Sequence, residues 1–178
     1  FDAIAHLAEL SNDPLGQQNP GLTHEINHQG SVDFANNARK AGVKRFVYMS
    51  SCSVYGVGSP DASLNEDIPV NPQTAYAECK VKVENDLTPM NDESFTTCFM
   101  RNATAYGASP RQRFDIVLND LCGLAWTTKE IKLLSDGTPW RPLVHALDMR
   151  QAVYCALKAP AEKVGGQAMN VGSTEQNY

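Results

Sequence analysis

The sequence contains no long apolar segment, and none of its hydrophobic runs approaches the ~20 residues that a membrane-spanning helix needs. No charged segment followed by an apolar one stands at its beginning, as it would in a secretory signal. The five cysteines are odd in number, scattered and free of any CxxC pair: Cys52, Cys79, Cys98, Cys122 and Cys155. This pattern is typical of reduced thiols and does not indicate a metal site. We therefore expect a cytoplasmic protein without a metal or a membrane partner.

An excess of positive charge is also missing. Fifteen Lys and Arg against twenty Asp and Glu give a net charge of −5 and a pI near 5.3. This balance argues against a nucleic-acid-binding surface, whereas a small anionic substrate needs only a local basic pocket. The 178 residues are 42% hydrophobic, which is enough to build the core of one domain or slightly more.

Apolar runs alternate with helical patterns in the first hundred residues. Strands are expected at 1–8, 44–51 and 95–103, a polar loop at 9–21, and helices at 22–41 and from 75 to about 87. In the first helix Ile26, Val32, Phe34 and Ala38 lie on or near one stripe, and Thr74 is the expected N-cap of the second. Strands that alternate with helices predict parallel pairing and an α/β fold.

The pattern changes after Gly107. A helix is expected at 113–128, short strands at 130–137 and 141–148, a helix at 149–160 and a last strand at 167–173. We assign residues 1–107 to one domain and 108–178 to part of a smaller region, with residues from about 142 to 160 packing back on the first domain.

Tyr76 and Lys80 stand four residues apart in the segment TAYAECK (74–80). Residues i and i+4 share a helix face, so the Lys80 ammonium can lower the pKa of the phenol from ~10 and prepare Tyr76 to exchange protons with a hydroxyl group. Six tyrosines and eight lysines in 178 residues give roughly 0.27 such pairs by chance, so a solvated helix face is the alternative. Ser51, at the carboxyl end of the preceding strand, can hydrogen-bond the same hydroxyl.

These segments together resemble the extended short-chain dehydrogenase/reductases, in the nucleotide-sugar epimerase/dehydratase branch. The matching segments, in order, are HLAELS (6–11), INHQGS (26–31), SSCSVYG (50–56), YAECK (76–80), RNATAYG (101–107) and RPLVHALD (141–148). Each is weakly specific alone, but six in order over nearly the whole chain are strongly specific. The resemblance implies a Rossmann-type doubly wound parallel sheet that lacks its N-terminal strands, with part of a small α/β substrate-binding domain.

The resemblance also implies which residues contact the cofactor and carry the chemistry. Tyr76 would be the acid/base, Lys80 would hold the nicotinamide ribose and tune Tyr76, and Ser51 would bind the reacting hydroxyl. The other expected cofactor contacts are Leu7, Ala8, Asn27, Asn102 and Ala103. The cofactor would be NAD or NADP, with NAD favoured.

The substrate implied by the resemblance is a nucleotide sugar. Besides Ser51, its expected contacts are Thr104, Asn119 and Arg141, whose guanidinium suits phosphate oxygens. Arg141 could instead pair with a nearby aspartate, and Asn119 could be a polar turn of its helix. The segment PRQR (110–113) is either a phosphate-binding loop or a solvated one. The family architecture further predicts a homodimer through the helices at 22–41 and 80–87.

The sequence departs from the family pattern at several positions. Glu9 stands where Ala is usual, and a carboxylate there would disfavour cofactor phosphates unless it pointed away. Thr104 stands where Asn is commoner. Cys52 and Ser53 replace the Asp-Glu pair of the 4,6-dehydratases, which disfavours that elimination reaction. The family's GxxGxxG turn, which binds the pyrophosphate at a helix N-terminus, is absent from the sequence.

The sequence therefore predicts a nicotinamide-dependent, epimerase-like enzyme. Tyr76 would take a proton from a sugar hydroxyl while the cofactor takes a hydride and later returns it. One alternative is a reductase of a non-sugar ketone, and another is a catalytically idle chain of the same family. Because the glycine turn is absent, we expect weak NAD(H) binding and no measurable turnover from this chain by itself.

Overall fold

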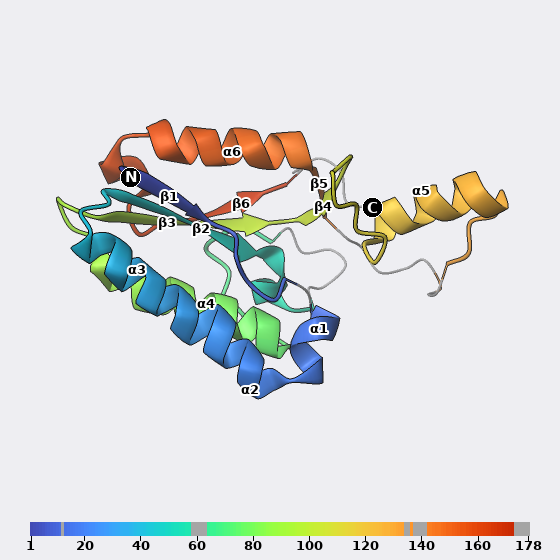
Figure 1. The fold of residues 1–178 in the computed structure, drawn as a ribbon, viewed down its shortest axis with the longest axis horizontal. Coiled ribbons are helices and arrows are strands. Elements are labelled where there is room, and N and C mark those ends of the chain that lie inside the picture. Colours follow the sequence, from blue (N-terminus) through green and yellow to red (C-terminus); the bar gives the residue numbers. More distant parts are fainter. Residues whose placement is uncertain (12, 58–63, 134–135, 137–141, 173–178) are drawn as a thin grey trace.

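The computed structural model describes residues 1–11, 13–57, 64–133, 136 and 142–172. Its centre is a four-stranded sheet in the order β1-β2-β3-β6 (Figure 1). The strands are β1 (Ala3–His6), β2 (Arg45–Ser51), β3 (Thr96–Asn102) and β6 (Ala168–Val171). All neighbouring strands in this sheet run parallel, which confirms the predicted α/β fold.

The two central strands are buried along almost their whole length. β2 and β3 have helices on both faces, which is why both read as nearly continuous apolar runs in the sequence. Among the described residues β1 pairs with β2 alone, and it ends at His6, two residues earlier than predicted. Leu7 and Ala8 follow it as exposed residues at the carboxyl edge of the sheet.

Helices cover the two faces of the sheet. α3 (Gly30–Lys40) and α4 (Ala75–Leu87) lie on one face, and α6 (Ala146–Lys158) lies on the other (Figure 1). Successive residues of β2 point to opposite faces, as the period of a strand requires. Phe46 therefore packs in the cluster beneath α3 and α4, whereas Val47 packs in the cluster beneath α6.

The helix predicted at 22–41 is a continuous helical segment of three parts: α2 (Pro20–Thr23), the π-helical η1 (His24–Gln29) and α3. The predicted apolar stripe is only partly correct, because Ala38 is buried but Ile26 and Phe34 are exposed.

The buried side of this segment carries small and polar residues instead, including Thr23, Asn27 and Ser31. Each is hydrogen-bonded internally; the Thr23 hydroxyl, for example, donates to the carbonyl of Gly16 at 3.0 Å. Satisfied polar groups can be buried at little cost. Hydrophobic periodicity could not reveal a buried face of this composition.

α4 begins at the predicted N-cap, since the Thr74 hydroxyl accepts a hydrogen bond from the Ala77 N–H at 3.1 Å. The short helix α1 (Asp13–Gln18), which lies in the predicted loop, packs against this end of α4. The Asp13 carboxylate accepts from the Thr74 hydroxyl. A Cβ added to Gly16 would lie only 3.3 Å from the Cβ of Tyr76, so the glycine permits the close packing that positions Tyr76.

The remaining elements lie beyond the sheet or connect its strands. β4 (Thr104–Tyr106) and β5 (Leu143–His145) form a two-stranded parallel sheet past the end of β3, and α5 (Val117–Thr128) lies farther out (Figure 1). The short helical elements are η2 (Cys52–Tyr55), η3 (Thr88–Met90) and α7 (Ala161–Val164).

Several predictions for this half of the chain were wrong. α5 begins at Val117 and not at 113, and the described residues 130–133 of the predicted strand at 130–137 are not in a strand. α6 begins at Ala146 because the His145 ring accepts a hydrogen bond from the Leu147 N–H and caps the helix, which also ends β5. β6 is shorter than predicted.

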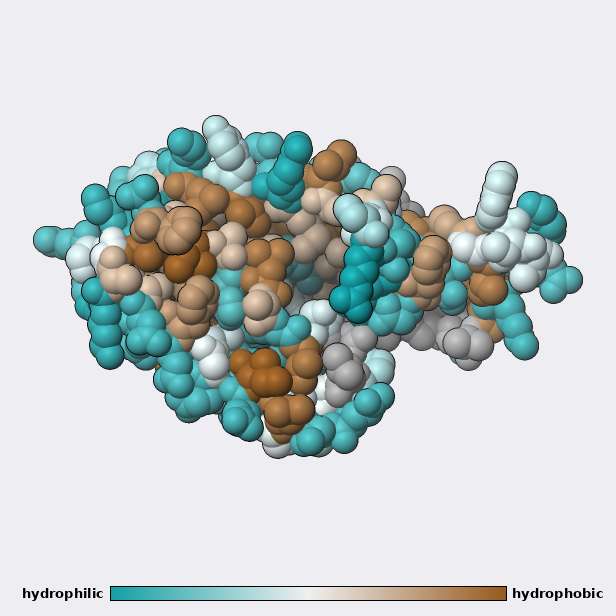
Figure 2. Space-filling model, viewed as in Figure 1, coloured by the Kyte–Doolittle hydropathy of each residue, from teal (hydrophilic) through white to brown (hydrophobic). Residues whose placement is uncertain are grey.

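An apolar area is exposed over β1, between α6 and α3 (Figure 2). Phe1 is fully exposed and Phe34 is 43% exposed in this part of the chain. β1 is an edge strand, so its outer side has no strand partner among the described residues. Within the described part of the chain, no helix combines the length and the apolar character that crossing a membrane requires.

Candidate active site

The three predicted catalytic residues lie together at the carboxyl edge of the sheet. Ser51 is the last residue of β2, and Tyr76 and Lys80 occupy the first two turns of α4. The Ser51 hydroxyl acts to lower the pKa of Tyr76, which places the two side chains close together. The Lys80 Nζ lies 5.3 Å from the centre of the Tyr76 ring. Open α/β sheets bind their ligands at this edge.

The Ser51 hydroxyl is oriented by the turn that follows it. Its Oγ accepts hydrogen bonds from the backbone N–H of Ser53 at 3.2 Å and from the Ser53 hydroxyl at 2.9 Å. With both donors in place, the proton of Ser51 is free to point to another acceptor, such as Tyr76 or a ligand. The sequence interpretation missed the role of Ser53; a serine two residues after another serine at a strand end is the local turn signal that could have indicated it.

Tyr76 is harder to ionise than the sequence suggested. Burial raises the pKa of Tyr76 well above its ordinary value, and the Glu9 carboxylate raises the pKa further, while the Ser51 hydroxyl acts in the opposite direction. The direction is opposite to the one expected from Lys80 alone. Tyr76 is therefore a neutral phenol at physiological pH.

Lys80 is almost completely buried and paired. Its ammonium donates to the Glu9 carboxylate and to the carbonyl of Met49. Burial lowers the pKa of Lys80, and the charge of Glu9 opposes that change. The carboxylate that departs from the family pattern thus points inward onto Lys80, where sequence patterns had left its direction open. It lies 71 residues from Lys80 in the sequence, which is why no local motif revealed the pair.

The predicted cofactor contacts near β1 have different environments. Leu7 and Ala8 are exposed at the sheet edge, where a ligand could reach them. The Asn27 side chain is fully buried, and both ends of its amide bond the backbone of Leu10: the oxygen accepts from the N–H at 2.8 Å and the nitrogen donates to the carbonyl at 2.9 Å. Asn27 therefore holds the segment that follows β1.

Asn102 ends β3 directly beside Ser51 in the sheet register. Its amide nitrogen donates to the carbonyls of Ser50 and Met100 at 3.2 and 2.9 Å. Its oxygen is buried and has no hydrogen-bond partner among the described residues. Buried acceptors in proteins are normally hydrogen-bonded to a donor, and the N–H group of a carboxamide would provide one. The residues at this edge, with buried Ala103 next to them, therefore fit a nicotinamide group.

The predicted substrate contacts lie on the far side of the edge. Thr104 begins β4, and its N–H donates to the carbonyl of Pro142 at 3.0 Å. The Asn119 amide accepts from the Gly107 N–H at 3.4 Å and donates to the Arg113 carbonyl at 3.0 Å, so it fastens the loop between β4 and α5. Arg141 lies outside the described residues.

Arg113, within the segment PRQR, is a basic group that the sequence interpretation left undecided. Its guanidinium forms an ion pair with Asp115 at 2.7 Å and donates to the carbonyl and hydroxyl oxygens of Ser11, both at 3.3 Å. The hydrogen bonds that Arg113 donates to Asp115 are the largest cause that raises the pKa of Arg113, and Tyr76 contributes to the same shift, which places the guanidinium near the tyrosine. Arg113 therefore connects the loop before α5 with the segment after β1.

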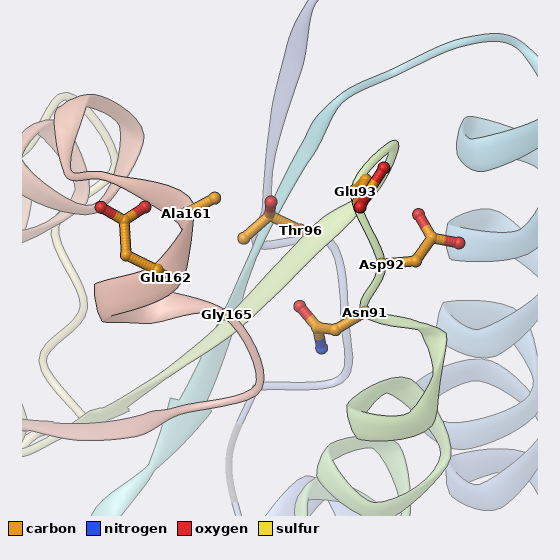
Figure 3. A pocket seen from close by; sticks show the side chains of 7 residues that line it. All are labelled: Asn91, Asp92, Glu93, Thr96, Ala161, Glu162 and Gly165. Carbon is orange, nitrogen blue, oxygen red and sulfur yellow. The ribbon is translucent and has the colours of Figure 1, made fainter.

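A pocket of about 270 Å³ lies at the opposite, amino end of β3 (Figure 3). Its lining residues are Asn91, Asp92, Glu93, Thr96, Ala161, Glu162 and Gly165. Three carboxylates make this pocket unsuitable for a phosphate group, and it is far along β3 from Asn102. It is not part of the candidate site. In the part of the chain that the structure describes, no group of three His, Cys, Asp or Glu side chains could hold a metal ion.

Comparison with known proteins identifies relatives of this chain. The model of the NAD dependent epimerase/dehydratase family matches residues 1–172. The UDP-glucose 4-epimerase of Mycolicibacterium smegmatis is 32% identical over 97% of this chain, and the UDP-glucose 4-epimerase of Bacillus subtilis is 26% identical over 97%. The chain spans 55% and 56% of the lengths of these two relatives.

Solved structures share the fold. The UDP-glucose 4-epimerase of Thermotoga maritima with UDP-glucose has a TM-score of 0.88 at 22% identity, covering 99% of this chain and 57% of that one. RMD from Pseudomonas aeruginosa complexed with NADPH has a TM-score of 0.83 at 23% identity, covering 99% and 61%. These likenesses show a Rossmann-like parallel sheet with flanking helices. Because the family model matches nearly its whole length, the chain belongs to the NAD-dependent epimerase/dehydratase family.

Proposed function

We propose that this chain carries the proton-exchanging site of a nicotinamide-dependent, epimerase-like enzyme that acts on a nucleotide sugar. The observation that carries the proposal is the grouping of Ser51, Tyr76 and Lys80 at the carboxyl edge of the sheet, with the Lys80 ammonium 5.3 Å from the centre of the Tyr76 ring. The substrate class is supported by relatives that include UDP-glucose 4-epimerases.

In this proposal each side chain has a defined task. Tyr76 exchanges a proton with a sugar hydroxyl, and Ser51 hydrogen-bonds that hydroxyl and directs it to the phenol oxygen. Since Tyr76 is a neutral phenol in the ligand-free chain, it must lose its proton before it acts as a base. A bound nicotinamide dinucleotide would accept and return a hydride. Lys80 and Asn102 would hold its nicotinamide and ribose groups.

The proposal extends to the wider protein. Leu7, Ala8 and Ala103 would contact the cofactor, for which NAD is favoured over NADP. The region 108–178 would bind the substrate through Asn119 and Arg141, and Thr104 would add a contact from the first domain. We also propose a cytoplasmic location and a homodimer. The dehydratase reaction is disfavoured, because Cys52 and Ser53 stand where that reaction needs carboxylates.

The test is the variant Tyr76→Phe in a protein that combines this chain with a pyrophosphate-binding turn. With NAD and UDP-glucose, we expect conversion to the 4-epimer to fall by about 10²–10⁴-fold, because a positioned acid/base contributes that much. Circular dichroism should show an unchanged fold. Tyr154→Phe, at an exposed tyrosine of α6, is the matched control and should keep its rate. Full activity in Tyr76→Phe would refute the assignment.

A further inference from the structure

The side chain of Glu9 lies in the interior of the candidate site. Glu9 and Lys80 form an ion pair in which the two side chains are only 3% and 4% exposed. The Tyr48 hydroxyl also donates to the Glu9 carboxylate at 2.6 Å, and the Ser31 hydroxyl donates to it at 3.2 Å. A buried carboxylate with three donors has a fixed position.

The backbone and neighbours of Glu9 are fixed as well. Asn27 bonds both backbone groups of Leu10, the next residue. The ring of His6 lies 2.9 Å from the Ser31 hydroxyl, measured from Nε2 to Oγ. The Glu9 carboxylate therefore cannot turn to solvent without breaking contacts from β2, α3 and α4.

Glu9 uses part of the hydrogen-bonding capacity of Lys80. An ammonium group has three N–H donors, and Glu9 and the Met49 carbonyl use two of them. The negative charge of Glu9 also compensates the positive charge that would otherwise favour a phenolate at Tyr76. In agreement, burial is the largest cause of the raised pKa of Tyr76, and Glu9 is the next.

We propose that Glu9 is a positioning residue that occupies the Lys80 ammonium, weakens the stabilisation that Lys80 would give to a Tyr76 phenolate and competes with a ligand hydroxyl for Lys80. The ligand chemistry is that of a ribose, whose hydroxyls can accept from an ammonium N–H. The inference rests on the proposed function, because it treats Tyr76 as the proton-exchanging group.

Other titratable groups surround this pair. Those near Glu9 and Lys80 are His6, Tyr48, Cys79 and Glu84, and those near Tyr76 are Asp13, Cys52 and Arg113. Glu9 raises the pKa of Tyr76 more than Asp13 or Cys52 does. Removal of the Glu9 charge is therefore the most direct test.

The experiment uses NMR to follow the ionisation of Tyr76 in the ligand-free chain. Tyrosine is labelled at Cζ, and the variant Tyr76→Phe identifies which signal belongs to Tyr76. Glu9→Gln removes the charge and keeps an acceptor oxygen. It should lower the Tyr76 titration midpoint by about one pH unit or more, a tenfold change in its ionisation constant. Glu25→Gln, at an exposed carboxylate of η1, should leave the midpoint unchanged. An unchanged midpoint in Glu9→Gln would overturn the proposal.

A second variant covers the case in which Glu9→Gln does not fold, which circular dichroism would show. Glu9→Ala should give the same fall in the Tyr76 midpoint, and added acetate should reverse that fall by supplying a carboxylate. If the Glu9→Ala midpoint equals that of the wild type, the proposal fails.

NADH fluorescence, measured in the protein that combines this chain with a pyrophosphate-binding turn, separates this inference from the proposed function. If Glu9 competes for Lys80, NADH should bind about tenfold more tightly to Glu9→Gln than to the wild type. A lower Tyr76 midpoint without any NADH binding would support the effect of Glu9 on Tyr76 and contradict the proposed cofactor. NADH binding of equal strength in both proteins, with an unchanged midpoint, would retain the proposed function and refute the role of Glu9.

Discussion

Glu84 and Arg101 form a second buried ion pair, which joins α4 to β3. Two nitrogens of the guanidinium reach the carboxylate, at 2.7 to 3.2 Å, and a third donates to the Tyr55 hydroxyl at 2.9 Å. The Ser50 hydroxyl donates to the same carboxylate. Buried charges persist only when they are paired and hydrogen-bonded. Together with Lys80, this pair fixes the position of α4 along the strands, and hence the position of Tyr76.

Asp92 provides a pH-dependent test at the level of one residue. Its carboxylate accepts from the hydroxyl and N–H of Ser94, both at 2.7 Å, and from the Phe95 N–H at 2.9 Å, and it pairs with Arg39. The Ser94 hydroxyl is the first cause that lowers the pKa of Asp92 to about 2. The folded pKa is thus below the unfolded value of ~3.9. The contribution to stability is therefore present above about pH 4 and is lost as the pH falls toward 2.

We expect Asp92→Asn to be less stable than the wild type at neutral pH, and the two to converge below pH 4. Urea unfolding at a series of pH values measures this difference in the free energy of unfolding. Glu93→Gln removes a charge from the neighbouring exposed position and should show no such convergence. A difference between Asp92→Asn and the wild type that persisted at the lowest pH would contradict the assignment.

At the scale of elements, the turn after β2 is the part of the site with the least steric freedom. η2 follows Ser51 immediately and ends at Gly56, whose φ of 69° and ψ of −140° favour glycine. A Cβ added there would lie 2.1 Å from the carbonyl oxygen of Asn71. The turn that orients Ser51 therefore depends on a glycine at this position.

Gly56→Ala should lower the free energy of unfolding by roughly 3 kcal/mol, because backbone strain and a clash with a carbonyl add together. Gly42→Ala is the control, since Gly42 also has a positive φ, of 81°, but nothing lies within 4 Å of an added Cβ. That variant should lose only about 1 kcal/mol. Equal losses in the two urea titrations would show that the close contact with Asn71 is unimportant.

At the scale of the whole molecule, the layers decide which surfaces remain for a partner. In α4, Val83 and Leu87 are fully buried against the sheet and contribute no surface to a dimer, whereas Val81 is half-buried. The segment that packs beside α4 does expose apolar residues, because Leu22 is 43% and Ile26 is 38% exposed. If the proposed homodimer uses this pair of helices, these residues must lie at its interface.

Ile26→Glu should therefore weaken the proposed dimer, since a charge would be buried at the contact. Light scattering over a range of protein concentrations should show a dimer for the wild type and a shift toward monomer for the variant. Val117→Glu, at an apolar residue of α5 with 45% exposure, should behave as the wild type. A monomeric wild type at high concentration would refute the dimer.

Much of the fold could be predicted because its signals are local. The central strands β2 and β3 are continuous apolar runs. The N-cap of α4 is also a local signal, because the Thr74 hydroxyl accepts from the N–H of Ala77, only three residues later. The boundaries near β5 were wrong because His145 ends a strand and caps a helix at the same point, which periodicity does not indicate. α1 was missed because its contacts to α4 are tertiary.

The sequence by itself determined the alternation of the central strands and helices, from which parallel pairing was predicted, and the spacing of Tyr76 and Lys80 on one helix face, since these signals lie in neighbouring residues. Only the tertiary structure decided what those side chains meet. Lys80 is paired with Glu9, which lies just after β1. Burial and the same Glu9 carboxylate raise the pKa of Tyr76. These contacts join residues far apart in the chain, and burial, which sets their strength, exists only once the layers have packed.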